Sequence, residues 1–393
     1  MASSQEIIAQ FKEYVIPNYT RYPVALVRGD GPFVWDAEGK RYIDFFPGWG
    51  CNMFGHCPKP VVEALREQVG RLIHVPNSWY TEEQGIWAKM LSERSFGGQA
   101  FFCNSGTEAN EAAIKLVRLH SPKGKYKIIT FQGAFHGRTM GSISATGQPK
   151  YHHGIEPLLP GFTYVPHGDL EAAAAAIDEE TAAIMIEPIQ GEGGVRIPTR
   201  EFLQGLRDLC DKHHLLLVFD EVQTGCGRTG EWFGYQYFGV EPDIMTLAKT
   251  ICSGVAAGAM LARREIAPSL RPGMHAATFG GNPIAAAAGI ATIKMVEAEG
   301  LLDKAKALGV QFKKRLEAMA ESLDIIQEVR VAGAMIGAEL RTPGAALVQS
   351  CMENGLLINC TQGNVIRLLP AVNTPPELVD EALDILEEQL RKG

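Results

Sequence analysis

The most constraining feature of this sequence is a series of short apolar runs in its middle part, which alternate with amphipathic segments. Continuous apolar runs of this length are typical of strands buried on both faces, and helices between such strands indicate a largely parallel α/β sheet. Ligands bind such sheets beyond the carboxyl ends of the strands, so the polar residues there are candidate site residues. The runs are Gln99–Asn104, Lys127–Phe131, Ala182–Glu187, Leu215–Asp220 and Asp243–Ala248.

The two ends of the chain have a different pattern. Residues Phe33–Phe46 predict a β-hairpin with Ala-Glu-Gly-Lys as its turn. Two long helical patterns, Ile284–Glu299 and Leu302–Ser322, are followed by a tail that predicts strand, helix and strand. We expect this tail to pack with the N-terminal hairpin as a smaller lobe. The predicted organisation is an N-terminal segment (1–55) that packs with the small domain, a large domain (56–282) and a C-terminal small domain (283–393).

Composition limits the classes of function. The chain has 393 residues, of which 46% are hydrophobic and 21% charged, as in a soluble globular protein large enough for two lobes. The net charge of −8 argues against general nucleic-acid binding, which needs a basic face. We expect no secretory signal, no membrane span, reduced thiols and a cytoplasmic location, because no suitable apolar run or CxxC pair is present. Two adjacent-histidine pairs lack a third ligand at metal-like spacing, so no metal site is predicted.

The segment from Asn104 to Asn110 follows the first apolar run and leads into an Ala-rich helical pattern. The first backbone N–H groups of a helix lack partners within the helix and lie at its positive end, so they can bind phosphate. Gly106 would allow close approach, and Ser105 and Thr107 would add hydroxyl groups. The alternative is a simple helix start in which Ser105 or Thr107 caps the helix.

Asp220 and Lys249 close two successive apolar runs, so both can face one ligand. A carboxylate at the end of a buried strand needs a partner, and a protonated pyridinium nitrogen is one. A magnesium-binding acid is the rival interpretation, but the chain has no GxxxxGK[ST] loop. A buried strand-end lysine can reach solvent, pair with an acid or act as a nucleophilic amine, as in enzymes that use pyridoxal 5′-phosphate (PLP). A structural Lys–Asp pair is the alternative.

Two further segments contain residues suited to binding. Phe135 can stack on a flat ring, and Arg138 has a planar guanidinium suited to a substrate carboxylate. The alternative for this segment is a surface loop with one core phenylalanine. Thr278–Pro283 is a Gly-rich turn before a helix, which can contact phosphate or simply begin the helix.

Taken together, these segments resemble the class III PLP-dependent aminotransferases, and most closely the acetylornithine-type members of arginine biosynthesis. The matching segments are long, occur in the family's order and cover most of the chain. The resemblance implies PLP-dependent transferase fold type I. It has a large domain with a mostly parallel sheet flanked by helices, and a smaller α+β domain from both chain ends. The segments are Phe101–Leu116, Lys127–Tyr151, Ile186–Val195, Leu216–Phe233, Pro242–Lys249, Thr278–Pro283 and Leu356–Val372.

The resemblance also implies a homodimer with shared active sites and a role for each matching residue. Lys249 is the Schiff-base lysine and Asp220 pairs with the ring nitrogen, and these two are the catalytic residues. Gly106 and Thr107 bind the phosphate, and Thr278 reaches the phosphate of the partner subunit's cofactor. Phe135 and Val222 lie on the two ring faces, and Gln223 lies near the ring hydroxyl. The implied cofactor-binding set is Gly106, Thr107, Phe135, Asp220, Glu221, Val222, Gln223, Lys249 and Thr278.

The implied substrate-binding set is Arg138, Ala277, Glu192, Arg367 and Tyr19. Arg138 would hold a substrate carboxylate. In the related ornithine aminotransferases, a glutamate matching Glu192 pairs with an arginine matching Arg367, and the pair opens to admit glutamate. We expect the glycines around Glu192 to leave its backbone room to move. The chain departs from the family at Ala277, where serine is frequent, and at 49–51, where Trp-Gly-Cys replaces smaller apolar residues.

The predicted reaction is ping-pong transamination. The favoured amino donor is N2-acetyl-L-ornithine and the acceptor is 2-oxoglutarate, giving N-acetyl-L-glutamate 5-semialdehyde and L-glutamate. N-succinyl-ornithine, N-succinyl-diaminopimelate and free ornithine are alternative donors. A PLP racemase or aminomutase, or a catalytically silent binding protein, would be a different class of protein. The presence of both Lys249 and Asp220 argues against the silent protein.

Overall fold

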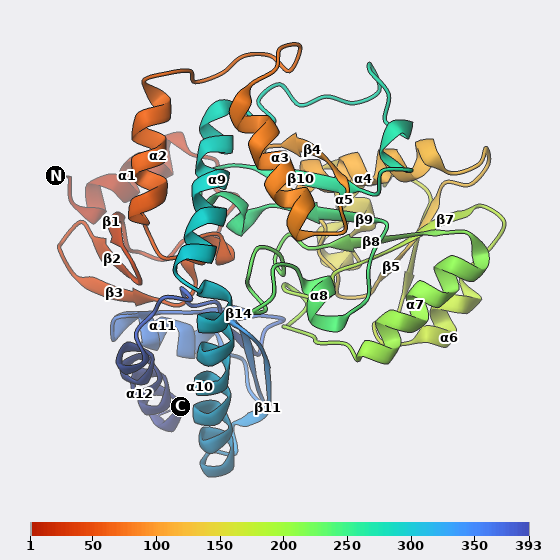
Figure 1. The fold of residues 1–393 in the computed structure, drawn as a ribbon. Helices are drawn as coiled ribbons and strands as arrows, with labels where there is room; N and C mark the ends of the chain where they lie inside the picture. Colours follow the sequence, from red (N-terminus) through yellow and green to blue (C-terminus); the bar gives the residue numbers. More distant parts are fainter. Residues whose placement is uncertain (1, 393) are drawn as a thin grey trace.

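The computed structural model describes residues 2–392, and its centre is a seven-stranded sheet in the order β4-β10-β9-β8-β7-β5-β6 (Figure 1). All neighbours pair in parallel except β10, which runs antiparallel to β4 and β9. The five predicted runs are confirmed as strands, whereas β6 and the short Gly/Ala-rich β10 were not predicted. The strands are β4 (Gln99–Cys103), β5 (Lys127–Phe131), β6 (Phe162–Val165), β7 (Thr181–Ile186), β8 (Leu216–Asp220), β9 (Ile244–Leu247) and β10 (Gly258–Ala262).

Apolar side chains fill both faces of this sheet, which explains why its strands are continuously apolar. Val218 of β8 belongs to a core cluster with the buried face of α4, and the next residue, Phe219, belongs to the larger cluster on the other face. Ile184 and Met185 of β7 divide between the same two clusters. Because successive strand side chains point to opposite faces, a strand covered on both sides needs no polar alternation.

Two smaller sheets accompany the large one. The predicted hairpin is confirmed as β2 (Phe33–Asp36) and β3 (Arg41–Asp44), which join β1 (Leu26–Asp30). β3 pairs in parallel with β13 (Leu356–Leu357), so the N-terminal segment packs with the C-terminal part of the chain (Figure 1). The other sheet has the order β11-β12-β15-β14, with β11 (Ile326–Ala332), β12 (Met335–Leu340), β14 (Asn359–Thr361) and β15 (Val365–Leu368).

The predicted strand–helix–strand tail is incomplete, since the structure adds strands and a final helix, α12. The two long helical patterns are confirmed as α9 and α10. None of the helices within residues 2–392 is both long enough and apolar enough to cross a membrane. The helices are α1 (Ser4–Tyr14), α2 (Lys59–Val69), α3 (Glu82–Arg94), α4 (Gly106–His120), α5 (Met140–Ala145), α6 (Leu170–Ala175), α7 (Arg200–His213), α8 (Gly234–Phe238), α9 (Pro283–Ala298), α10 (Leu301–Ser322), α11 (Ala345–Glu353) and α12 (Pro376–Lys392), with 3-10 turns η1 (Pro47–Gly50), η2 (Pro149–Tyr151), η3 (Lys249–Cys252) and η4 (Ala267–Ser269).

Candidate active site

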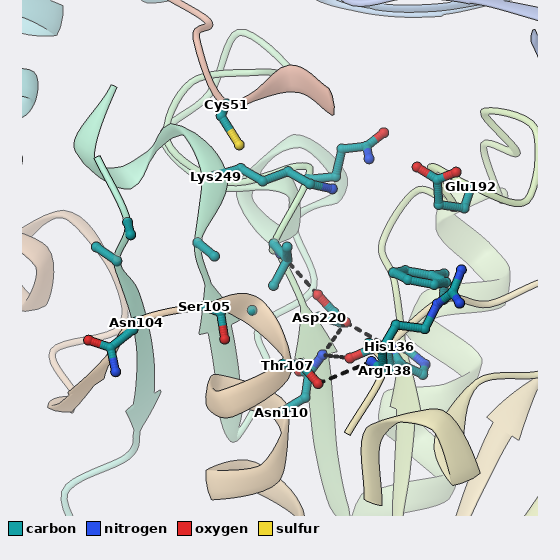
Figure 2. Close-up of a pocket in the computed structure, with 18 of the residues that line it drawn as sticks. Cys51, Asn104, Ser105, Thr107, Asn110, His136, Arg138, Glu192, Asp220 and Lys249 are labelled. Carbon is teal, nitrogen blue, oxygen red and sulfur yellow. Dashed lines mark hydrogen bonds and ion pairs between the residues drawn. The ribbon is translucent and has the colours of Figure 1, made fainter. Parts of the chain in front are cut away.

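A cavity of about 390 Å³ lies at the carboxyl edge of the large sheet (Figure 2). The loops that follow β4, β5, β7, β8 and β9 all contribute to its wall, as expected for a parallel sheet. Cys51, which follows η1, adds a residue from the N-terminal part of the chain. The lining residues are Cys51, Asn104, Ser105, Gly106, Thr107, Asn110, Phe135, His136, Gly137, Arg138, Glu187, Glu192, Asp220, Val222, Gln223, Ala248, Lys249, Gly254, Val255, Ala256 and Ala257.

Asp220, the last residue of β8, lies in this wall and is almost fully buried. Its Oδ2 accepts a hydrogen bond from Nδ2 of Asn110 at 2.7 Å and lies 2.8 Å from Nδ1 of His136 (Figure 2). Its Oδ1 accepts from the backbone N–H of Val222 at 3.0 Å. The carboxylate is therefore held at both oxygens and has a fixed orientation in the cavity.

The amide of Asn110 is itself oriented by a residue of the neighbouring strand. Thr246 of β9 is the register partner of Asp220, and its hydroxyl donates to Oδ1 of Asn110 at 2.7 Å. This contact turns the NH₂ group of Asn110 toward Asp220. Sequence reasoning assigned no role to Asn110 or His136, although each lies within a segment that it selected. Their positions in the sequence could have identified them as site residues. Asn110 lies one helical turn after Gly106, and His136 follows Phe135 directly.

Glu187 is a third residue of the cavity wall that sequence reasoning missed. It follows β7 directly, as a polar residue at the end of an apolar strand, and is buried. Its carboxylate accepts from the backbone N–H groups of Phe135 at 2.9 Å and Gly191 at 3.0 Å. Burial raises the pKa of Glu187 above its usual range. The side chain thus joins the loop that contains Phe135 to the loop that contains Glu192.

Lys249 begins η3, one residue after β9, and extends across the cavity toward the side on which Glu192 lies (Figure 2). Its backbone φ is +45°, a conformation that a long side chain rarely adopts and that is common at functional sites. Burial lowers the pKa of Lys249, an effect that Glu192 opposes and Arg367 reinforces. A lowered pKa increases the fraction of neutral, nucleophilic amine.

The start of α4 combines a helix cap with a position for an anion. Ser105 is the N-cap, and its hydroxyl accepts from the backbone N–H of Glu108 at 3.3 Å. A Cβ on Gly106 would lie 2.8 Å from a methyl carbon of Val222, so this position requires glycine. Gly106 and Thr107 both line the cavity at the positive end of a 15-residue helix. Capping and anion binding are therefore both available here, since Ser105 supplies the cap.

Phe135 and Arg138 lie on the loop after β5, at the more open side of the cavity. The Phe135 ring lies edge-on to Tyr151, with centroids 5.7 Å apart. Arg138 is exposed, and its guanidinium carbon lies 4.0 Å from the centre of the Tyr151 ring. This contact holds the guanidinium at the cavity, and no acidic side chain within residues 2–392 pairs with it, so a substrate anion can bind there.

Glu192 and Arg367 form the ion pair that the resemblance implied. Arg367 lies on β15 with its side chain 1% exposed, and its Nη1 is 2.7 Å from Oε1 of Glu192. The Glu192 side chain is 23% exposed and belongs to the cavity wall. Burial alone would raise the pKa of Glu192, but the charges of Arg367 and Lys249 outweigh it and the pKa is lowered. The pair is charged, and only its acidic member faces the cavity.

The backbone of Glu192 is held by two side chains, whereas its neighbouring glycines were expected to leave it room to move, and that movement stays a prediction. The Glu192 carbonyl accepts from Oγ1 of Thr361 at 2.6 Å and from Nε2 of Gln362 at 2.6 Å. A Cβ on Gly191 would lie 2.3 Å from the side-chain oxygen of Gln223. Gly191 therefore serves close packing, and the Glu192 side chain, which is 23% exposed, is the part of this residue with most space around it.

Glu221 was included in the predicted cofactor-binding set, but the structure does not bring it into the cavity. Its carboxylate points to the start of α8, where it accepts from the backbone N–H groups of Gly234 at 2.5 Å and Tyr235 at 2.6 Å. The Thr224 hydroxyl donates to it at 2.7 Å. Burial raises the pKa of Glu221 to about 7. Asp220 and Glu221 are adjacent, and only Asp220 faces the cavity.

Three other predicted residues, Thr278, Ala277 and Tyr19, do not line this cavity. Ala277 and Thr278 lie in the loop before α9, and Ala277 lines a separate hollow with Asn77. Tyr19 is exposed on the N-terminal segment, with its ring centroid 6.1 Å from that of Trp49. Among residues 2–392, no group of three or more His, Cys, Asp or Glu side chains is arranged to hold a metal ion.

Comparisons with known proteins agree with this geometry. The family model "Aminotransferase class-III" matches residues 14–390. The chain is 48% identical to acetylornithine aminotransferase of Caldanaerobacter subterraneus subsp. tengcongensis, over 98% of this chain and 99% of that protein. It is 48% identical to that of Methanocaldococcus jannaschii, over 96% of each chain. Among solved structures, acetylornithine aminotransferase from Elizabethkingia anophelis superimposes with a TM-score of 0.89, at 32% identity and 100% coverage of both chains.

Proposed function

The chain belongs to the class III aminotransferases, and we propose that its amino donor is N2-acetyl-L-ornithine and its acceptor 2-oxoglutarate. The products are N-acetyl-L-glutamate 5-semialdehyde and L-glutamate, a step of arginine biosynthesis. The observation that supports this choice of donor is the 48% identity, over 98% of this chain, to an acetylornithine aminotransferase. The Glu192–Arg367 pair supports a dicarboxylate acceptor, and ornithine aminotransferases have a matching pair. Free ornithine and N-succinylated donors are the alternatives within this class.

The enzyme uses pyridoxal 5′-phosphate, the cofactor of this family. The residues of the cavity fit this group, because a buried carboxylate, a buried amine and a helix start lie together in one wall. We assign the ring nitrogen to Asp220, the covalent link to Lys249 and the phosphate to Gly106 and Thr107. Phe135 and Val222 are assigned to the ring faces and Gln223 to the ring hydroxyl. When bound, the cofactor supplies an electron-accepting ring and a carbon that carries the amino group between the two substrates.

The chain contributes proton transfer and charge placement. The donor's amine would first displace the Lys249 amine, whose pKa is lowered by burial. The freed amine would then take the proton from the reacting carbon of the donor and deliver a proton to the cofactor carbon that carries the amino group. Asp220 stays fixed during these steps because Asn110 and His136 hold its Oδ2. An acid with a fixed orientation stabilises developing charge without having to reorganise.

Arg138 and Arg367 would together let one site accept both the amino donor and 2-oxoglutarate. The donor and 2-oxoglutarate share a carboxylate far from the reacting carbon, and we assign it to Arg138. A 2-oxo acid also has a carboxylate bonded to the reacting carbon, where an ω-amino donor has only hydrogen. Glu192 and Lys249 line the same cavity and Arg367 pairs with Glu192, so we place this pair beside that carbon. The Glu192 side chain would neutralise Arg367 with the donor and swing away for the acceptor; a permanent structural ion pair is the alternative.

We also propose a homodimer with shared active sites, in which Thr278 reaches the phosphate of the partner subunit's cofactor. Thr278 lies outside the cavity of its own chain, next to the exposed Phe279. The exposed Trp79 and Tyr80 belong to the loop before α3, and Asn77 of that loop donates to the backbone of Gly280. Large exposed apolar side chains grouped in this way are typical of an interface.

The domain limits at 55 and 282, the absence of nucleic-acid binding and the cytoplasmic location remain parts of the proposed function.

A panel of ω-amino donors with 2-oxoglutarate tests the proposal. We expect one glutamate per donor consumed and the highest kcat/KM with N2-acetyl-L-ornithine. A racemase or aminomutase would form no stoichiometric glutamate. A higher kcat/KM with free ornithine or an N-succinylated donor would overturn the donor assignment.

A further inference from the structure

We propose that Asn359 determines specificity for the acceptor: it is a neutral anchor that orients Arg367 and leaves its positive charge to the substrate. The inference rests on the proposed function, because it concerns how one site accepts a dicarboxylate after a donor that lacks the second carboxylate. Asn359 does not line the cavity and is assigned as a positioning residue that acts through Arg367.

The register of the small sheet places Asn359 next to Arg367. Asn359 on β14 is the direct partner of Arg367 on β15, and Gly337 on β12 is the partner on the other side. Both Nε and Nη2 of Arg367 donate to the same Oδ1 of Asn359, at 3.2 and 2.9 Å. One amide oxygen therefore fixes one edge of the guanidinium, and Nη1 is left to donate to Glu192, which lines the cavity.

The remaining contacts of Arg367 show which of its partners carries charge. Nη1 donates to Oε1 of Glu192 at 2.7 Å and lies 3.5 Å from the amide oxygen of Gln223. The Phe46 ring lies 5.2 Å from the guanidinium carbon. Among these partners only Glu192 is an acid, and its side chain is 23% exposed, against 1% for Arg367. The single acid is the partner that can leave without moving the cation.

The amide of Asn359 leaves the positive charge of Arg367 unneutralised, whereas a carboxylate at this position would neutralise it. When the Glu192 side chain leaves, two amides still orient Arg367 and its full charge faces the cavity. An aspartate of the same shape would form a two-bond ion pair with the buried guanidinium and neutralise it permanently. The dicarboxylate would then meet no net positive charge when Glu192 is away, and a net negative charge when it is present. The acceptor half-reaction requires a neutral residue here, whereas the donor half-reaction does not.

Asn359→Asp tests this directly in the holoenzyme at pH 8. Binding of glutarate, a dicarboxylate that cannot react, is measured by calorimetry, and each half-reaction by single-turnover cofactor absorbance. We expect glutarate affinity and the acceptor half-reaction to fall about tenfold or more, since like charges placed together are strongly unfavourable. The donor half-reaction should change less than about twofold, because a neutral residue is not needed there. The exposed Asn354→Asp is the matched control, since it adds the same charge at the end of α11, and it should leave all three quantities unchanged.

A double variant that moves the acid from position 192 to position 359 keeps the net charge of the site. It distinguishes an effect of the acid's position from an effect of total charge. Glu192→Gln combined with Asn359→Asp has the same net charge as the natural chain, which protects folding if Asn359→Asp alone is unstable. If the position of the acid matters, the double variant still binds glutarate about tenfold more weakly, because its acid cannot leave. Glu192→Gln alone should bind glutarate more tightly. The inference is overturned if Asn359→Asp, alone or combined with Glu192→Gln, binds glutarate as tightly as the natural enzyme does. A failure of the donor panel in the natural enzyme would overturn the proposed function instead.

Discussion

Nδ1 of His136 lies 2.8 Å from Oδ2 of Asp220, and both side chains are buried, with 0% and 3% of their surface exposed. The same oxygen accepts from Asn110, whose amide is oriented by Thr246. The structure has therefore fixed the orientation of Asp220 through residues of β9, α4 and the loop after β5. A preorganised acid of this kind is typical of sites that stabilise developing charge.

Asp220→Asn should retain the fold and part of the cofactor affinity, because the shape and the contacts at Oδ1 are preserved. Transamination should fall by about 10³-fold or more, because the negative charge beside the ring nitrogen is lost. The measurements are kcat with the preferred donor and cofactor content by absorbance. Turnover close to that of the natural enzyme would contradict the role of Asp220.

Thr246→Val should free the amide of Asn110 to rotate, since it removes the hydroxyl that donates to Oδ1 at 2.7 Å. We expect kcat to fall about fivefold to tenfold, as for the loss of one buried hydrogen bond. The pH titration of cofactor absorbance should also shift, which a purely structural contact would not cause. Thr246→Ser keeps the hydroxyl and is the control. An unshifted titration in Thr246→Val would mean that Asn110 has no effect on Asp220.

Borohydride reduction of the yellow holoenzyme should fix the cofactor on Lys249, because its amine is buried in the cavity wall. Peptide mass spectrometry identifies the labelled lysine. Lys150, whose amine lies 4.9 Å from the Tyr151 ring near the cavity, is the internal comparison and should remain unlabelled. Labelling at any other lysine would overturn the assignment.

The lowered pKa of Lys249 also predicts a pH dependence for the apo-protein. Only the neutral amine reacts with the cofactor's aldehyde, so the uptake rate should rise with pH and level off below pH 10.5, the ordinary value. Between the lowered pKa and 10.5 the unfolded chain binds more protons at this residue, so its contribution to the free energy of unfolding rises with pH. Stopped-flow absorbance measures the uptake. A midpoint at or above 10.5 would contradict the effect of burial.

Glu192→Ala should leave Arg367 unpaired on the cavity side, tighten 2-oxoglutarate binding and weaken the half-reaction with the ω-amino donor. Arg138→Ala should damage both half-reactions, because it holds the carboxylate that both substrates share. Single-turnover absorbance changes measure each half-reaction separately. If Glu192→Ala changes both by the same factor, the pair has only a structural role.

The sequence by itself determined five of the seven strands of the large sheet, and it singled out the polar residues at the ends of β8 and β9. Asp220 and Lys249 stood out because a polar residue after a continuous apolar run has few explanations, and the strand ends of a parallel sheet meet at one edge. The hairpin and the two long helices were also local patterns. The family motifs in the same segments identified the class of chemistry.

Only the tertiary structure decided which neighbours of those residues face the cavity. Glu221 follows Asp220 directly but turns to α8. Strand alternation separates two adjacent side chains, but only the packed structure decides which of the two acids faces the cavity. Asn110, His136 and Glu187 gained their roles through contacts with residues far away in the sequence. Asn359 meets Arg367 only through strand register. Such pairings depend on how separate elements pack, and the spacing of residues along one segment carries no information about the segment it will meet.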